Sequence, residues 1–153
     1  MNVPSVRQIQ RCGELLLGYR LLMHGIEASP MRASDDFNMI AITADARTKR
    51  TIYLETTLPD AVETGKRGTC NWWIPQSTQA DIVALCDLSS ESVWLLSMAE
   101  VQELSKEIAD GHLHLHRYVQ PTLDPEKTGH IVFSYEFDKF LIDQQIQRFF
   151  GSS

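Results

Sequence analysis

The fold is decided by two neighbouring stretches, SDDFNMIAI at residues 34–42 and TIYLETT at residues 51–57. Both are rich in apolar and β-branched residues and are bounded by polar loops, which predicts two adjacent strands. The first strand is apolar almost throughout, as expected of a strand that is covered on both faces. Asp36 stands at its entry, and Glu55 stands near the end of the second strand. Carboxylates gathered at strand ends can bind a hard divalent cation such as Mg²⁺.

Length and composition describe an ordinary globular protein. The chain has 153 residues, of which 43% are hydrophobic and 22% charged, so one domain with a proper core is expected. We assign residues 1–150 to that domain and residues 151–153 to a flexible tail. The net charge of -6 argues against a strongly basic nucleic-acid-binding surface, although a local basic patch remains compatible with it.

The cysteines and the hydropathy pattern bear on localisation. There are three cysteines, Cys12, Cys70 and Cys86, an odd number at no metal-binding spacing, which indicates reduced residues in or near the core. Residues 1–23 lack the pattern of a signal peptide, and no apolar run approaches the length of a membrane helix. We therefore expect a cytoplasmic protein with no membrane partner.

The first helix is predicted by a capping box, in which Ser5 and Gln8 stand three residues apart. Apolar residues recur behind it at helical spacing, and leucines widen this stripe until the second half is apolar nearly all round. Such a helix is expected to be buried on more than one face. Glu14 points away from the centre of the stripe, which predicts exposure unless that side is covered too.

The rest of the chain completes an α/β pattern. The antiparallel meander is expected from residues 26–31, 38–43 and 50–57. Further strands are predicted at residues 72–74, 80–86, 92–96, 112–116 and 131–135, loops at 59–68 and 121–129, and helices at 98–109, behind the capping box of Ser97 and Glu100, and at 137–150. We predict a single α/β domain with a central mixed β-sheet, an antiparallel three-strand meander and flanking helices.

This order of elements and acids resembles the PD-(D/E)XK nuclease superfamily, the fold of restriction endonucleases and Holliday-junction resolvases. In the resolvase-like branch a glutamate lies on the first helix, an aspartate opens the second strand and a Gln/Glu-x-Lys-Thr strand follows. Here the corresponding positions are Glu14, Asp35-Asp36-Phe37-Asn38 and Ile52-Tyr53-Leu54-Glu55-Thr56-Thr57, followed by Asn71-Trp72-Trp73-Ile74, Ala80-Asp81-Ile82-Val83 and Val93-Trp94-Leu95. The resemblance covers about residues 13–103 and implies a restriction-endonuclease-like fold.

The chain departs from the family at the catalytic positions. In the natural register Glu55 replaces the lysine, Tyr53 replaces the acid or amide, and Asn38 replaces the aspartate. A shift by two makes Glu55 the acid but puts Thr57 at the lysine. The family's lysine stabilises charge that develops beside the phosphate, so its loss removes part of the chemistry. Lys49, Lys66 or Arg67 could supply that charge from another backbone position.

Two functions follow from this resemblance. The favoured one is a nuclease-fold protein without catalysis, which serves as a binding or accessory module and can act as a homodimer. The alternative is a Mg²⁺-dependent DNA endonuclease. In it Asp36 and Glu55 hold the metal, Glu14 supports them, and Lys66 or Arg67 approaches the phosphate. The missing lysine, Asn38 and the acidic composition favour the first function.

Contacts with DNA are expected at two basic pairs and one aromatic residue. Lys49-Arg50 and Lys66-Arg67 lie in predicted loops beside the site and can contact phosphates. Trp72 is the candidate for stacking on a base, although Trp72 and Trp73 alternate along a strand, so only one of them can face outward.

A third candidate site is the alternation His112, His114 and His116, whose side chains share one side of a strand. Two such imidazoles could share a Zn²⁺ ion with an acid from another strand. The preferred interpretation is a half-exposed edge strand whose other face, with Leu113 and Leu115, belongs to the core.

Overall fold

The computed structural model describes residues 3–32, 36–59, 69–105, 107–118 and 137–151. Residues 60–68, the predicted loop at 121–129 and the predicted strand at 131–135 therefore lie outside the described residues. The elements are, in order, α1 Val6–Leu22, β1 Ile26–Pro30, β2 Met39–Thr43, β3 Lys49–Thr57, β4 Thr69–Pro75, β5 Ile82–Asp87, β6 Ser92–Leu96, α2 Met98–Leu104, β7 Glu107–Ala109, β8 His112–Tyr118, the 3-10 helix η1 Asp138–Phe140 and α4 Ile142–Phe150.

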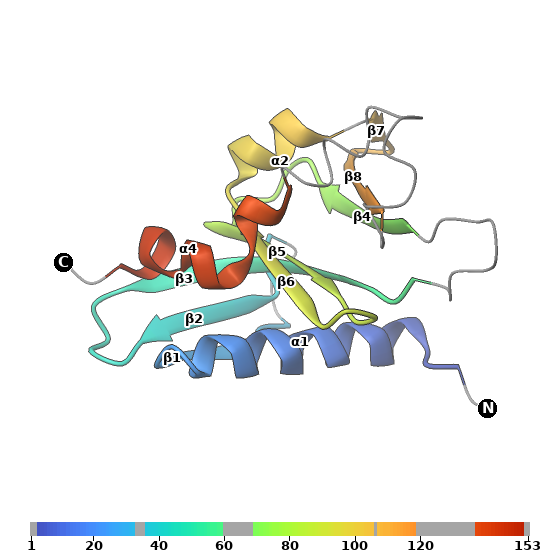
Figure 1. The fold of residues 1–153 in the computed structure, drawn as a ribbon. Coiled ribbons are helices and arrows are strands. Elements are labelled where there is room, and N and C mark those ends of the chain that lie inside the picture. Colours follow the sequence, from blue (N-terminus) through green and yellow to red (C-terminus); the bar gives the residue numbers. More distant parts are fainter. Residues whose placement is uncertain (1–2, 33–35, 60–68, 106, 119–136, 152–153) are drawn as a thin grey trace.

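A five-stranded mixed sheet forms the centre of the fold (Figure 1). Its strand order is β1-β2-β3-β5-β6, with β3 parallel to β5 and the other neighbours antiparallel. The predicted meander β1-β2-β3 and the predicted α/β class are confirmed. The parallel pair requires the chain to leave the sheet after β3 and return at β5.

The connection between β3 and β5 contains β4, which joins β7 and β8 from later in the chain in a second sheet that was not predicted. Strand β4 pairs with β8, and β8 pairs with β7, all antiparallel. In Figure 1 this sheet and α2 lie on one side of the central sheet, and α1 lies on the other. Strand β3 is therefore covered on both faces by different elements.

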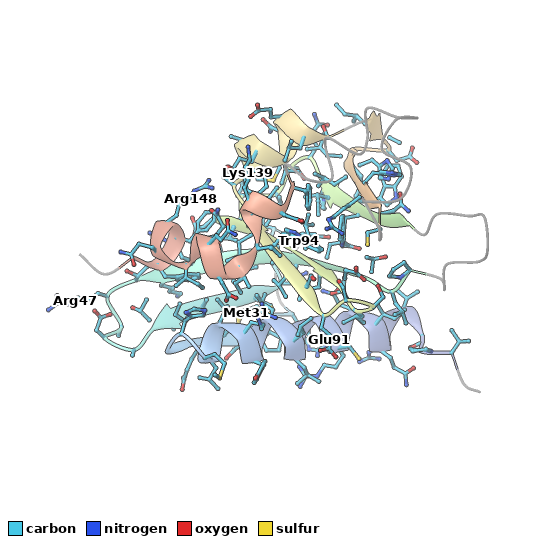
Figure 2. All side chains as sticks on the ribbon, in the orientation of Figure 1. Met31, Arg47, Glu91, Trp94, Lys139 and Arg148 are labelled. Carbon is cyan, nitrogen blue, oxygen red and sulfur yellow. The ribbon has the colours of Figure 1, made fainter. Side chains whose placement is uncertain are left out.

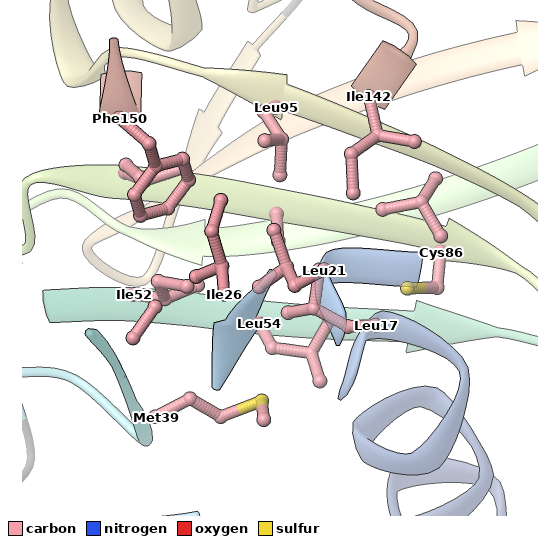
Figure 3. Packing of buried hydrophobic residues seen from close by; sticks show 14 residues of the cluster. Leu17, Leu21, Ile26, Met39, Ile52, Leu54, Cys86, Leu95, Ile142 and Phe150 are labelled. Atoms are coloured by element: carbon pink, nitrogen blue, oxygen red, sulfur yellow. The ribbon is translucent and has the colours of Figure 1, made fainter. Parts of the chain in front are cut away.

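The alternation of side chains along β3 divides the core in two. Ile52 and Leu54 join α1 and α4 in one apolar cluster, whose packing is shown in Figure 3. Tyr53 packs against the other cluster, which is formed with the second sheet, α2 and η1. Successive residues of β3 thus face different neighbours, as the period of two requires.

Helix α1 begins as predicted. Ser5 Oγ accepts a hydrogen bond from Gln8 N at 3.1 Å, and Gln8 Oε1 accepts one from Ser5 N at 2.8 Å. The expectation that α1 is buried on more than one face is wrong for the single chain. Leu17 and Leu21 are buried, whereas Leu15, Tyr19 and Leu22 are all more than half exposed.

Several other predictions need correction. Strand β2 is covered on one face only, since Ile42 is 39% exposed, because the second sheet does not extend over β1 and β2. The helix predicted at 98–109 ends at Leu104, and residues 107–109 form β7 instead. The last predicted helix is divided into η1 and α4. Cys70 and Cys86 are buried as expected, but Cys12 is exposed.

Candidate functional site

The start of β2, the second half of β3 and the N-terminal half of α1 meet at one corner of the central sheet. Asn38 connects the two strands: its Oδ1 accepts from Leu54 N at 2.7 Å, and its Nδ2 donates to Leu54 O at 2.9 Å. Gln10 on α1 donates through Nε2 to the same carbonyl oxygen at 3.0 Å. An amide can continue the strand ladder in this way because it carries both a donor and an acceptor. A carboxylate at position 38 could only accept.

Helix α1 lies very close to β3 at this corner. A Cβ atom added at Gly13 would overlap Thr56 Oγ1, so only glycine fits between the helix and the strand. Thr56 Oγ1 is buried, and it has no hydrogen-bond partner among the described residues. The second half of β3 therefore presents Leu54 and Thr56 to the helix.

Glu14 stands on the same side as Thr56, one residue after Gly13. Its side chain is only 10% exposed, so this side of the helix is covered. Arg11 Nη1 lies 3.2 Å from Glu14 Oε1 and forms an ion pair with it. The Glu14 carboxylate is thus paired with Arg11. The face of β3 toward α1 has no second carboxylate.

Glu55 faces the opposite side of β3, together with Tyr53. Burial raises the pKa of Glu55 from 4.5 to about 7, while the nearby charge of His112 lowers it. Burial, assisted by the charge of Glu55, raises the pKa of Tyr53 to about 12. Helix α1 lies against the other face of β3. The support of Asp36 and Glu55 by Glu14 at one metal centre stays a prediction.

Asp36 lies just before β2, where its backbone oxygen accepts a hydrogen bond from Thr78 Oγ1. Thr78 belongs to the buried part of the connection between β4 and β5. Among the described residues, no group of three or more His, Cys, Asp or Glu side chains is arranged to hold a metal ion. A two-carboxylate Mg²⁺ site at Asp36 and Glu55 stays a prediction.

The predicted basic pair Lys49-Arg50 lies at the opposite end of β3 from Glu55. Lys49 and Arg50 belong to β3 itself and are not in a loop. Lys49 is six residues from Glu55, which is about 20 Å along a strand. Arg50 Nε donates to Phe149 O at 2.9 Å and so ties β3 to α4. Lys66 and Arg67 lie outside the described residues.

A basic groove at the N-terminal half of α1 was missed by the sequence analysis. It has a volume of about 600 Å³ and is lined by Val6, Arg7, Gln10, Arg11, Glu14 and Arg32. Arg11 is paired with Glu14, so Arg7 and Arg32 carry the excess positive charge. The helical spacing of Arg7 and Arg11 was a visible signal. Arg32 follows β1, and it lies beside Arg7 only because the chain folds back along α1 there, which local sequence does not indicate.

The two adjacent tryptophans of β4 have opposite environments. Trp72 is fully buried and its Nε1 donates to Cys86 O at 3.1 Å, so the prediction that Trp72 stacks on a base is wrong. Trp73 is the outward residue, 38% exposed, with its ring stacked on His114 at a centroid distance of 4.2 Å. Any stacking role on this strand belongs to Trp73.

Two of the three histidines of β8, His112 and His114, have side-chain hydrogen bonds. His112 Nδ1 donates to Asp110 O at 2.9 Å, and His114 Nε2 lies 2.8 Å from Asn71 Oδ1. The rings of His114 and His116 are 6.2 Å apart and nearly perpendicular. Within the part of the chain that the structure describes, these histidines do not form part of a group of three or more His, Cys, Asp or Glu side chains that could hold a metal ion.

Comparison with known proteins identifies the fold. A solved structure of the bacterial homing endonuclease I-Ssp6803I superposes with a TM-score of 0.54 over 90% of this chain and 95% of that chain. The fold is nuclease-like. The two sequences share 8% identity, so the likeness concerns the fold alone. No family model and no curated protein sequence matches the chain.

The described helices were also compared with the requirements of a membrane span. None of them is both long enough and apolar enough to cross a bilayer.

Proposed function

We propose that this protein binds DNA through a nuclease-like fold and does not cleave it. The observation that carries this proposal is the identity of the β3 side chains that face α1. Leu54 and Thr56 are two residues apart and point toward the helix that carries Glu14. In the PD-(D/E)XK family that the sequence resembles, this strand supplies an acid or amide and a lysine at that spacing. The sequence register assigns these positions to Tyr53 and Glu55, which lie on the face of β3 away from α1. The pair that faces the helix, Leu54 and Thr56, contains neither an acid or amide nor a lysine.

The missing groups are the ones that phosphodiester cleavage requires. Carboxylates hold one or two metal ions that polarise the phosphate and activate water. A positioned cation then stabilises the charge that develops in the transition state. Glu14 is bound by Arg11, and Asn38 uses both its donor and its acceptor on Leu54. The face of β3 that packs against α1 therefore lacks the carboxylate and the cation that a cleavage site of this kind needs.

The basic groove supports DNA as the partner. Arg7 and Arg32 stand at this same corner, on a chain whose overall charge is -6. A concentration of positive charge on an acidic protein attracts a polyanion locally even though the net charge does not. The structural neighbour is an endonuclease by name, which agrees with a nucleic acid as ligand.

Binding is tested by fluorescence anisotropy with a labelled DNA duplex over a range of salt concentrations. The double variant Arg7→Ala/Arg32→Ala should weaken binding by about tenfold or more and reduce the salt slope by about 2, since each phosphate contact contributes about 0.9. The matched control is Arg47→Ala/Lys49→Ala, which removes two exposed cations from the opposite end of the sheet, where Figure 2 shows Arg47. If the control weakens binding and the groove variant does not, DNA lies on the β2–β3 hairpin.

Cleavage is tested separately with plasmid and branched DNA in Mg²⁺ or Mn²⁺. We expect none from the wild-type protein. The informative control is Asp36→Ala/Glu55→Ala. Cleavage that disappears in this variant would replace our proposal with the Mg²⁺-dependent endonuclease, with Asp36 and Glu55 as metal ligands. Cleavage that persists in it would have another source.

A further inference from the structure

Helix α1 has two apolar faces, and the fold uses one of them. Leu17 and Leu21 pack into the core. On the outer side Leu15 is 57% exposed, Tyr19 is 60% exposed and Leu22 is 58% exposed. Large apolar side chains that are exposed singly are common, but a continuous row of them on one element marks an interaction surface.

The row has the spacing of a helix-pairing seam. Exposed Cys12 continues it toward the N-terminus, and the steps from Cys12 to Leu15, Tyr19 and Leu22 are three, four and three residues. These are the steps between the a and d positions of a heptad, the positions that interlock between two helices. We call these four residues the outer seam. The core-facing Leu17 and Leu21 fall at other heptad positions.

We propose that the outer seam packs against the outer seam of a second copy of this chain, with the two α1 helices antiparallel. Two-fold symmetry makes the surface self-complementary. Leu15 then faces the partner's Tyr19, and Cys12 faces the partner's Leu22. Each copy buries the row that its own fold leaves exposed.

Charge complementarity selects the antiparallel arrangement. Arg11 flanks the N-terminal half of the seam and is 51% exposed. Exposed Glu27 follows the C-terminal end of the helix and lines a groove together with Leu22. Antiparallel pairing brings Arg11 toward the partner's Glu27 and sets the two helix dipoles in opposite directions. Parallel pairing would set the two Arg11 side chains at one end of the interface and the two Glu27 side chains at the other, without pairing opposite charges.

The expected interface is modest in size. A helix of 17 residues is about 25 Å long, which gives a contact at the small end of specific interfaces. The groove beside Leu22, of about 580 Å³ and lined also by Met31, Ile40 and Ile42, extends the apolar surface around the edge of the sheet. We therefore expect a dissociation constant on the order of micromolar.

Sedimentation velocity from about 1 μM to about 100 μM tests the association. The wild-type protein should change from monomer to dimer over this range, and Tyr19→Glu should weaken dimerisation at least tenfold. The matched control is Ile108→Glu, which places the same charge on an equally exposed apolar residue of β7. A monomer at every concentration, or a dimer unaffected by Tyr19→Glu, would overturn the proposal. Because mass is read without DNA, this result is independent of the proposed DNA binding.

Disulfide trapping tests the orientation. Leu22→Cys creates a thiol opposite the partner's Cys12, and an added oxidised dithiol reagent should accept two electrons and two protons as the bond forms. Wild-type protein should not cross-link. Its two Cys12 residues would lie about 15 Å apart along the seam, and Cys70 and Cys86 are buried. Rapid cross-linking of the wild-type dimer through Cys12 would show parallel helices and overturn the arrangement.

Discussion

The two faces of β3 differ in how tightly they are packed and in the ionisable groups that they carry. On the α1 side, the second half of the strand is packed so closely that Gly13 has no room for a Cβ atom, and Leu54 and Thr56 fill the contact. On the other side, Tyr53 and Glu55 carry ionisable groups under partial cover from the second sheet. The strand is packed tightly on the face toward α1, and its carboxylate, Glu55, lies on the other face.

This difference separates Glu14 on α1 from Glu55 on β3. Glu14 and Glu55 are separated by a strand, because β-strand side chains alternate between faces. A one-residue change of register would exchange the two faces and bring Glu55 under α1. That register is excluded here, since Ile52 and Leu54 would leave the core. Burial of Ile52 and Leu54 thus determines which face of β3 carries Glu55.

The largest expected effect comes from the face of β3 that packs against α1. Gly13→Ala should destabilise the protein by about 3 kcal/mol, because the added methyl group overlaps Thr56 and the helix must move away from β3. Urea denaturation measures the change. Thr56→Ala in the same chain should recover part of the loss by removing the overlapping atoms.

Gly18→Ala is the matched control for this prediction. A Cβ atom at Gly18 has no heavy atom within 4 Å, so the substitution should stabilise α1 by about 0.5–1 kcal/mol through helix propensity. Equal effects of the two substitutions would show that α1 does not contact β3 as described.

The next largest effect is expected at Asn38, which connects β2 to β3 through its two hydrogen bonds with Leu54. Asn38→Asp should cost about 2 kcal/mol, since the carboxylate accepts from Leu54 N but repels Leu54 O instead of donating to it. Thermal unfolding at pH 7 measures this. The matched control is Asn71→Asp, at an exposed residue of β4 whose Oδ1 accepts from His114. It should change stability by less than about 0.5 kcal/mol. Similar losses at both positions would contradict a special role for Asn38.

Local signals predicted the parts of the fold that depend on a few adjacent residues. The capping boxes at Ser5 and Ser97 are complete within four residues, and both helices begin where these predict. Strand β7 was missed, although Asp110-Gly111 is a hairpin signal and both residues have positive φ. There the helical pattern of residues 98–109 competed with strand pairing, and pairing with β8 prevailed.

The candidate site could be predicted only in part because it depends on which neighbour covers each face. Alternation required one of Trp72 and Trp73 to be buried, but the choice followed from the second sheet, which no local pattern announced. The same holds for Glu14, which a helical wheel alone predicts to be exposed. Arg32 reaches the groove through tertiary structure. The sequence therefore indicated the residues of the corner more reliably than the direction in which each one points.

The smallest expected effect concerns the acid on the covered face. Burial raises the pKa of Glu55 to about 7, so between about pH 4.5 and 7 the folded protein keeps a proton that the unfolded chain has released. Stability from this group is therefore complete below pH 4.5 and is lost as the pH rises through 7. Glu55→Gln should remove that loss and be more stable than wild type by about 1–2 kcal/mol at pH 8. Urea denaturation across this range measures it, with exposed Glu103→Gln as the matched loss of one carboxylate. If the Glu55→Gln and wild-type curves stay parallel, Glu55 is solvated, and the contrast between the two faces of β3 rests on packing alone.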